Sequence, residues 1–167
     1  MTTLNEPDNT GIPLHMIKVD QSGRIIKRIS FSGFAVPRYS GACVRWGLFE
    51  AFSQPGKIYA QHMQFPDSSQ FVMANLAIRK GSISYREPSA LEAIGIGCMQ
   101  EHTEEFIYAD QAGGDKFDAV GSNCRICERT NCAQRNQPNF RKNFVADVNR
   151  RGVSPFGPPP QIDGLFH

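Results

Sequence analysis

The chain has 167 residues, 40% of them hydrophobic and 20% charged, a composition typical of one globular domain and not of a disordered segment. Its net charge of +2 argues against a domain that binds nucleic acid by itself, because such domains usually carry a strong basic excess. No apolar run approaches the roughly 20 residues that span a membrane, and the polar N-terminus is not typical of a signal peptide. We therefore expect a cytoplasmic protein, in which its five cysteines are not paired in structural disulfides.

The first half of the chain predicts two β-hairpins with a short helix between them. Residues 1–11 are expected to be a flexible leader, and residues 12–31 read as two apolar strands around an Asp-Gln-Ser-Gly turn. The apolar spacing of residues 44–52 predicts a short helix that ends before Pro55-Gly56. The second hairpin is predicted over residues 57–79, with Pro-Asp-Ser-Ser as its turn.

The second half is less regular. Residues 91–99 predict a buried strand, in which Gly95 and Gly97 allow another group to approach the backbone closely. The remaining expectations are an edge strand over 82–86, a helical turn over 101–108, a loop over 111–114, an irregular cysteine-rich segment over 121–138, a helix over 140–151 and a proline-rich tail. Together these elements predict an α+β fold, built on an antiparallel sheet with short helices.

Cys124, Cys127 and Cys132 form a C-x2-C-x4-C cluster among polar residues, which simple burial explains poorly. One tight turn can direct the first two sulfurs at one ion, so the cluster predicts a metal site. Three ligands are one short of a closed site, and the spacing does not decide whether Cys43 or Cys98 supplies the fourth. Zinc and an iron–sulfur cluster both accept this set; the absence of a second cysteine or histidine pair favours iron–sulfur.

We expect no catalytic activity, because no common catalytic or phosphate-binding motif is present and no nucleophile is paired with a base. Arg141, Arg150 and Arg151 could contact the phosphates of a ligand. The alternative interpretation is that they lie on a solvated helix face.

Five segments occur in an order that resembles the C-terminal domain of the short-chain fatty acyl coenzyme A regulators. The most specific is VGSNCRICERTNCAQR, and the others are IKVDQSGRIIKRIS, SGACVRWGLFEAFSQPGKI, AIGIGC and DVNRRGVSPFG. This family comprises bacterial transcription factors of acetate and propionate (methylcitrate) metabolism. Two positions depart from the expected pattern: Val44 stands where proline is expected, and no Asp directly follows Cys98.

The resemblance implies a sensing domain over residues 12–160, followed by a tail over 161–167, with a sheet similar to GAF or PAS sensor domains. DNA would be bound by a helix-turn-helix part that this chain lacks, and the full regulator would be a homodimer. The implied effector is an acyl-CoA, held between a basic rim and apolar walls for which Phe31, Phe34, Phe65 and Phe71 are candidates.

In the propionate branch of the family, the resemblance also implies an iron–sulfur cluster. Carried over by position, its ligands would be Cys124, Cys127 and Cys132 with Cys98 or Cys43. The alternatives are a structural zinc-binding interaction module, or a redox-sensing domain with no small-molecule effector.

Overall fold

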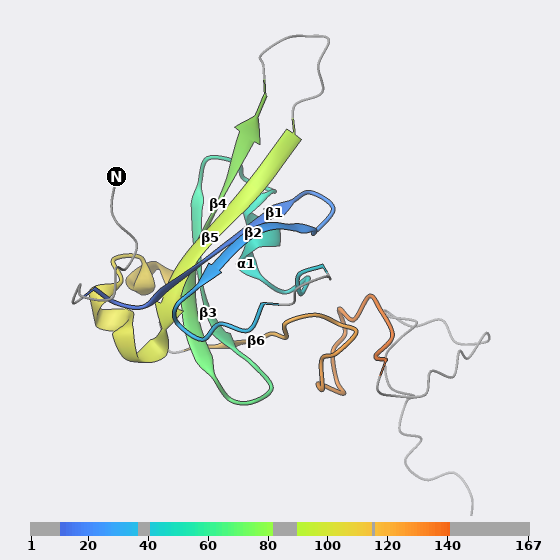
Figure 1. Cartoon of the computed structure of the whole chain (residues 1–167). Coiled ribbons are helices and arrows are strands. Elements are labelled where there is room, and N and C mark those ends of the chain that lie inside the picture. The colour runs from blue at the N-terminus through green and yellow to red at the C-terminus, as the bar shows by residue number, and fades with distance from the viewer. Residues whose placement is uncertain (1–10, 37–40, 82–89, 115, 141–167) are drawn as a thin grey trace, which may run out of the picture.

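The computed structural model describes residues 11–36, 41–81, 90–114 and 116–140, and these form a sheet with short helices on both faces (Figure 1). The six strands lie in the order β2-β1-β5-β4-β3-β6, and only the β3–β6 pair is parallel. Their bounds are β1 Leu14–Asp20, β2 Ile25–Ser30, β3 Ile58–Gln64, β4 Gln70–Lys80, β5 Ala90–Met99 and β6 Asp118–Ala119. The helices are α1 Gly47–Ala51 and two 3-10 helices, η1 Gln100–Glu105 and η2 Ala109–Ala112. The α+β prediction is confirmed.

Both predicted hairpins are present, and local turn chemistry explains them. Between β1 and β2, one carboxylate oxygen of Asp20 accepts hydrogen bonds from the backbone N–H groups of Ser22 and Arg24, at 2.9 and 3.0 Å. Gly23 adopts a positive φ of 80°, which costs glycine little. Asp67 accepts a similar bond from the N–H of Ser69 at the β3–β4 turn.

Strand β5 joins the two hairpins into one sheet, because it pairs with β1 on one side and β4 on the other. Its glycines leave room for two buried polar side chains. A Cβ atom on Gly97 would lie 2.8 Å from Nε2 of His15, and one on Gly95 would lie 2.9 Å from Oδ1 of Asn75. The predicted close approach at these glycines is confirmed.

Helix α1 and the aromatic core lie on one face of the sheet, which we call the core face. Phe34, Phe65 and Phe71 are at most 5% exposed, and the ring of Phe34 packs edge-on against the other two and against Trp46. The prediction that these phenylalanines line a ligand groove is therefore wrong: they fill the core, and only Phe31 is exposed. The opposite face is covered at one end by η1 and η2, through a smaller cluster around Val72 and Cys98.

Three elements differ from the sequence-based expectation. Helix α1 begins at Gly47, because Trp46 has an extended backbone and the N–H of Gly47 donates to the side chain of Gln61. A 3-10 turn over 109–112 takes part of the predicted loop, and β6 was not predicted. The predicted edge strand over 82–86, nearly all of the leader and helix over 140–151, and the tail lie outside the described residues.

Candidate functional site

The cysteine-rich segment packs beside the chain that precedes α1, about 80 residues earlier in the sequence (Figure 1). Three hydrogen bonds join the two. Trp46 Nε1 donates to the carbonyl of Gly121 at 2.8 Å, the N–H of Gly121 donates to the sulfur of Cys43 at 3.5 Å, and Asn123 Nδ2 donates to the carbonyl of Gly41 at 2.5 Å. The segment is therefore fixed against the core at its N-terminal end.

This packing brings four cysteines around one small enclosed cavity of about 10 Å³: Cys43, Cys124, Cys127 and Cys132. Gly121 permits the approach, since a Cβ atom there would lie only 2.6 Å from the sulfur of Cys127. Within the described ranges, no three metal-ligating side chains are already arranged as a metal site. The four sulfurs would have to close further to share one ion.

The fifth cysteine lies elsewhere. Cys98 is fully buried on the opposite face of the sheet, where it packs with Val72 and Ala109 and its thiol lies 3.7 Å from the carbonyl of His102. Burial raises the pKa of this thiol to about 11. The structure therefore joins Cys43, and not Cys98, to the clustered cysteines.

Arg135 organises the loop that carries the clustered cysteines. Its guanidinium group is buried and donates to the carbonyls of Cys124 at 2.8 Å, Cys127 at 3.3 Å and Arg129. Asn139 Nδ2 donates to the carbonyl of Cys127 at 2.7 Å. These bonds satisfy backbone acceptors that have no partner in a helix or strand, so an irregular loop can be buried.

The charge around the cavity suits thiolate ligands. Burial raises the pKa of the Cys43 thiol, and the neighbouring Cys124 and Cys127 raise it further. Bringing several thiolates together is therefore unfavourable without a positive charge nearby. Arg45, Arg129 and Arg135 line the same cavity, and a bound metal would supply more positive charge.

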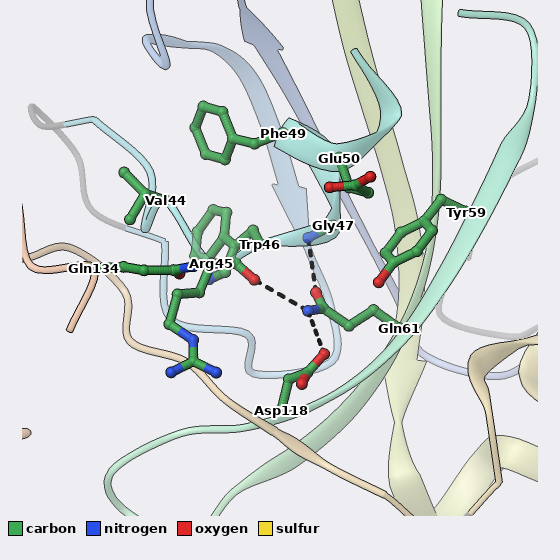
Figure 2. Close-up of a pocket in the computed structure, with 10 residues that line it drawn as sticks. All are labelled: Val44, Arg45, Trp46, Gly47, Phe49, Glu50, Tyr59, Gln61, Asp118 and Gln134. Atoms are coloured by element: carbon green, nitrogen blue, oxygen red, sulfur yellow. Dashed lines mark hydrogen bonds between the residues drawn. The ribbon is translucent and has the colours of Figure 1, made fainter. Parts of the chain in front are cut away.

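A polar pocket of about 290 Å³ adjoins this cavity and shares Val44 and Arg45 with it (Figure 2). The side chain of Gln61 in β3 connects three residues that line the pocket. Its carbonyl oxygen accepts a hydrogen bond from the N–H of Gly47 at 2.7 Å, and its amide nitrogen donates to the backbone carbonyl of Arg45 and to the carboxylate of Asp118. The pocket is also lined by the side chains of Glu50, Tyr59 and Gln134. Its two carboxylates make it a poor site for phosphate groups.

The predicted phosphate contacts Arg141, Arg150 and Arg151 lie outside the described residues. The sequence analysis did not identify Gly121, Arg135 or Gln61 as parts of the site. Gly121 and Arg135 stand at the two ends of the cysteine segment, and no local pattern around Gln61 in β3 marks its role.

Residues 3–156 match the family described as "Short-chain fatty acyl coenzyme A regulator, C-terminal". The chain is 36% identical over 159 residues to the propionyl-CoA carboxylase regulator of Cereibacter sphaeroides, and 34% identical over 161 residues to RamB, an HTH-type transcriptional regulator of Mycobacterium tuberculosis. Each alignment covers 93% of this chain and 34% of the relative, so the chain spans about a third of their length.

A solved structure has the same fold. A transcriptional regulator of Mycobacterium tuberculosis superposes with a TM-score of 0.79 at 31% sequence identity. The superposition covers 93% of this chain and 48% of the solved one. The sheet described above is therefore also the fold of about half of that solved regulator.

Proposed function

The chain belongs to the short-chain fatty acyl coenzyme A regulators, as their C-terminal domain, and from this premise we propose that it senses an acyl-CoA and holds an iron–sulfur cluster through cysteine. The observation that carries the metal proposal is that Cys43, Cys124, Cys127 and Cys132 line one cavity. Four thiolates are a complete ligand set for such a cluster. When bound, it would make the domain responsive to oxidants.

The residues around the cavity would serve the cluster in distinct ways. Arg135 would hold the loop carbonyls and so fix where Cys124 and Cys127 lie. Gly121 would leave space for the sulfur of Cys127. The positive charges of Arg45, Arg129 and Arg135, which are among the residues around the cavity, would offset the negative charge of the thiolates.

Zinc is the second candidate, and the size of the cavity favours it. A volume of about 10 Å³ holds about one water-sized atom. A single ion therefore needs the four sulfurs to lie closer together, whereas a cluster needs a larger space between them. Tetrahedral zinc accepts the same four cysteines.

We expect the anaerobically purified chain to be brown, with a broad visible absorption band and matching amounts of iron and sulfide. Absorption spectroscopy and elemental analysis on the same sample make the measurement. A colourless protein with one zinc per chain would replace the cluster by a structural zinc site. A chain that binds neither metal under reducing conditions would contradict a metal site at these cysteines.

The acyl-CoA proposal rests on the family, which is named for acyl coenzyme A, and on the propionyl-CoA carboxylase regulator among the relatives. The polar pocket beside the cysteines is our candidate for the part of the effector that forms hydrogen bonds (Figure 2). Because its acids repel phosphates, the phosphates would lie outside it, and the residues that the sequence predicts to contact them are Arg141, Arg150 and Arg151. The likeness to GAF or PAS sensors remains a prediction.

Calorimetric titration with propionyl-CoA tests this proposal. We expect binding, and we expect the double variant Arg150→Ala/Arg151→Ala to bind at least about tenfold more weakly, since each lost charge-assisted bond costs about 1.5–3 kcal/mol. Lys57→Ala, an exposed lysine in the turn before β3, is the matched control and should bind as the parent does. If propionyl-CoA, acetyl-CoA and CoA all produce no heat of binding, the result would favour a domain that binds no small-molecule effector.

The larger regulator would bind DNA through a helix-turn-helix part, as the HTH-type relatives do by their names. We propose a regulatory, non-catalytic role in the cytoplasm. Within the described residues, no helix is long and apolar enough to cross a membrane.

A further inference from the structure

The four cysteines that line the small cavity are not held equally firmly. Cys43 and Cys124 are buried, with 6% and 7% of their surface exposed, whereas Cys127 and Cys132 are half-buried. Segments of a folded chain with few hydrogen bonds and few buried contacts open locally with the smallest free energy. The cysteine that leaves a shared ion most easily should therefore be the one whose backbone is held least.

Three of the four are fixed by contacts with buried groups. The sulfur of Cys43 accepts the N–H of Gly121 at 3.5 Å, and the carbonyls of Cys124 and Cys127 accept from the buried guanidinium group of Arg135 at 2.8 and 3.3 Å. The sulfur of Cys127 also lies close against Gly121, where a Cβ atom would be only 2.6 Å from it. These three cysteines cannot move without breaking such contacts.

Cys132 is the exception. It lies in the middle of residues 130–134, and the other four residues of this loop are exposed. Within the described part of the chain, its one hydrogen bond is that of a turn, in which its carbonyl accepts the N–H of Arg135 at 3.2 Å. Both ends of the loop are fixed, since Arg129 Nε donates to the carbonyl of Val120 at 2.8 Å and the carbonyl of Arg129 accepts from the side chain of Arg135.

We propose that Cys132 is the exchangeable ligand of the metal site and the position at which a soft electrophile from solution modifies the metal-loaded chain. This inference rests on the metal site proposed above, and it adds which of the four ligands reacts with solution. Releasing Cys132 requires only residues 130–134 to move, because the contacts of Arg129 and Arg135 remain in place. The same argument applies to zinc and to an iron–sulfur cluster, because both are held by thiolates.

The modification is an S-alkylation, for which iodoacetamide is a suitable probe. The thiolate sulfur of Cys132 attacks the methylene carbon of iodoacetamide, a carbon–sulfur bond forms, and the carbon–iodine bond breaks as iodide leaves. The product is a neutral thioether, whereas the ligand that a metal requires from cysteine is the thiolate. Three thiolates are one short of a closed site, so the metal should be released once Cys132 is alkylated.

Timed alkylation of the metal-loaded chain under anaerobic conditions measures the order in which the cysteines react. Trypsin cleaves after arginine, and an arginine follows each of the four cysteines before the next one, so each falls on its own peptide for mass spectrometry. We expect Cys132 to react at least about tenfold faster than any of the other three. Metal release, followed by absorption or with a zinc-binding dye, should keep pace with the labelling of Cys132.

Cys127 is the informative comparison, because it is half-buried like Cys132 but its carbonyl accepts hydrogen bonds from two side chains. Exposure alone would label both cysteines at similar rates. Asn139→Ala removes the bond of 2.7 Å to the carbonyl of Cys127, so it should speed the labelling of Cys127 and leave that of Cys132 unchanged. Cys98→Ala is the control and should alter neither rate, because Cys98 lies on the opposite face of the sheet.

Metal analysis before the labelling separates this inference from the metal proposal. If a loaded chain reacts at Cys127 as fast as at Cys132, or first at any other cysteine, Cys132 is not the exchangeable ligand and the metal site itself stands. Metal release that runs ahead of the labelling of Cys132 would overturn the inference in the same way. A reduced chain that takes up no metal would overturn the metal site, and this inference with it.

Discussion

Alanine at Cys43, Cys124, Cys127 or Cys132 should remove most of the metal that we propose for this domain, whereas Cys98→Ala should leave the metal content unchanged. The first four side chains line one cavity, and Cys98 lies on the other face of the sheet. Loss of even an outer-shell partner of a metal ligand typically costs about 10–100-fold in affinity, so loss of a ligand should cost at least as much. This is the largest effect that we expect from any single substitution.

The informative comparison is between Cys43→Ala and Cys98→Ala, because both thiols are buried and both lie far from the cluster in sequence. Iron, sulfide and zinc per chain are measured after anaerobic purification, with circular dichroism to verify folding. A cluster that survives Cys43→Ala and is lost in Cys98→Ala would contradict Cys43 as the fourth ligand. Metal binding also contributes free energy of folding, so the four depleted variants should unfold at lower temperature.

The domain should lose stability as the pH falls below about 6.5, because of His15. Its side chain is fully buried, stacks on Phe34 at 4.3 Å, and bonds Ser32 through Nδ1, while Nε2 has no hydrogen-bond partner. Burial lowers its pKa from 6.5 to about 3. Between these values the unfolded chain takes up a proton that the folded chain refuses, so stability falls by up to about 1.4 kcal/mol per pH unit.

Urea unfolding between pH 7 and pH 5 measures this effect, because the carboxyl groups remain largely ionised in that range. We expect the parent chain to lose about 2 kcal/mol between pH 7 and pH 5. His15→Gln cannot take up the proton and should show a much flatter dependence, whatever its stability at pH 7. Equal slopes in the parent and His15→Gln would show that His15 is not the group responsible.

The parts of the fold that could be predicted from the sequence are those set by interactions between residues close together in the chain. The two hairpins follow from turn residues such as Asp20, Gly23 and Asp67, which act within four residues of themselves. The buried strand β5 follows from its apolar run, and its glycines mark the close approach of His15 and Asn75. Helix α1 was predicted too long, because its start is set by Gln61 on another strand.

The amino-acid sequence by itself determined the α+β class, the family and the clustered Cys124, Cys127 and Cys132, whose spacing lets one short loop bring them together. The sequence did not decide which cysteine is the fourth ligand, since Cys43 and Cys98 are both small thiols far from the cluster along the chain. Only the tertiary structure separated them: Trp46 and Gly121 bring Cys43 to the loop, and the alternation of β5 points Cys98 to the opposite face. Such contacts join residues about 80 positions apart, and they arise only once the whole sheet has assembled.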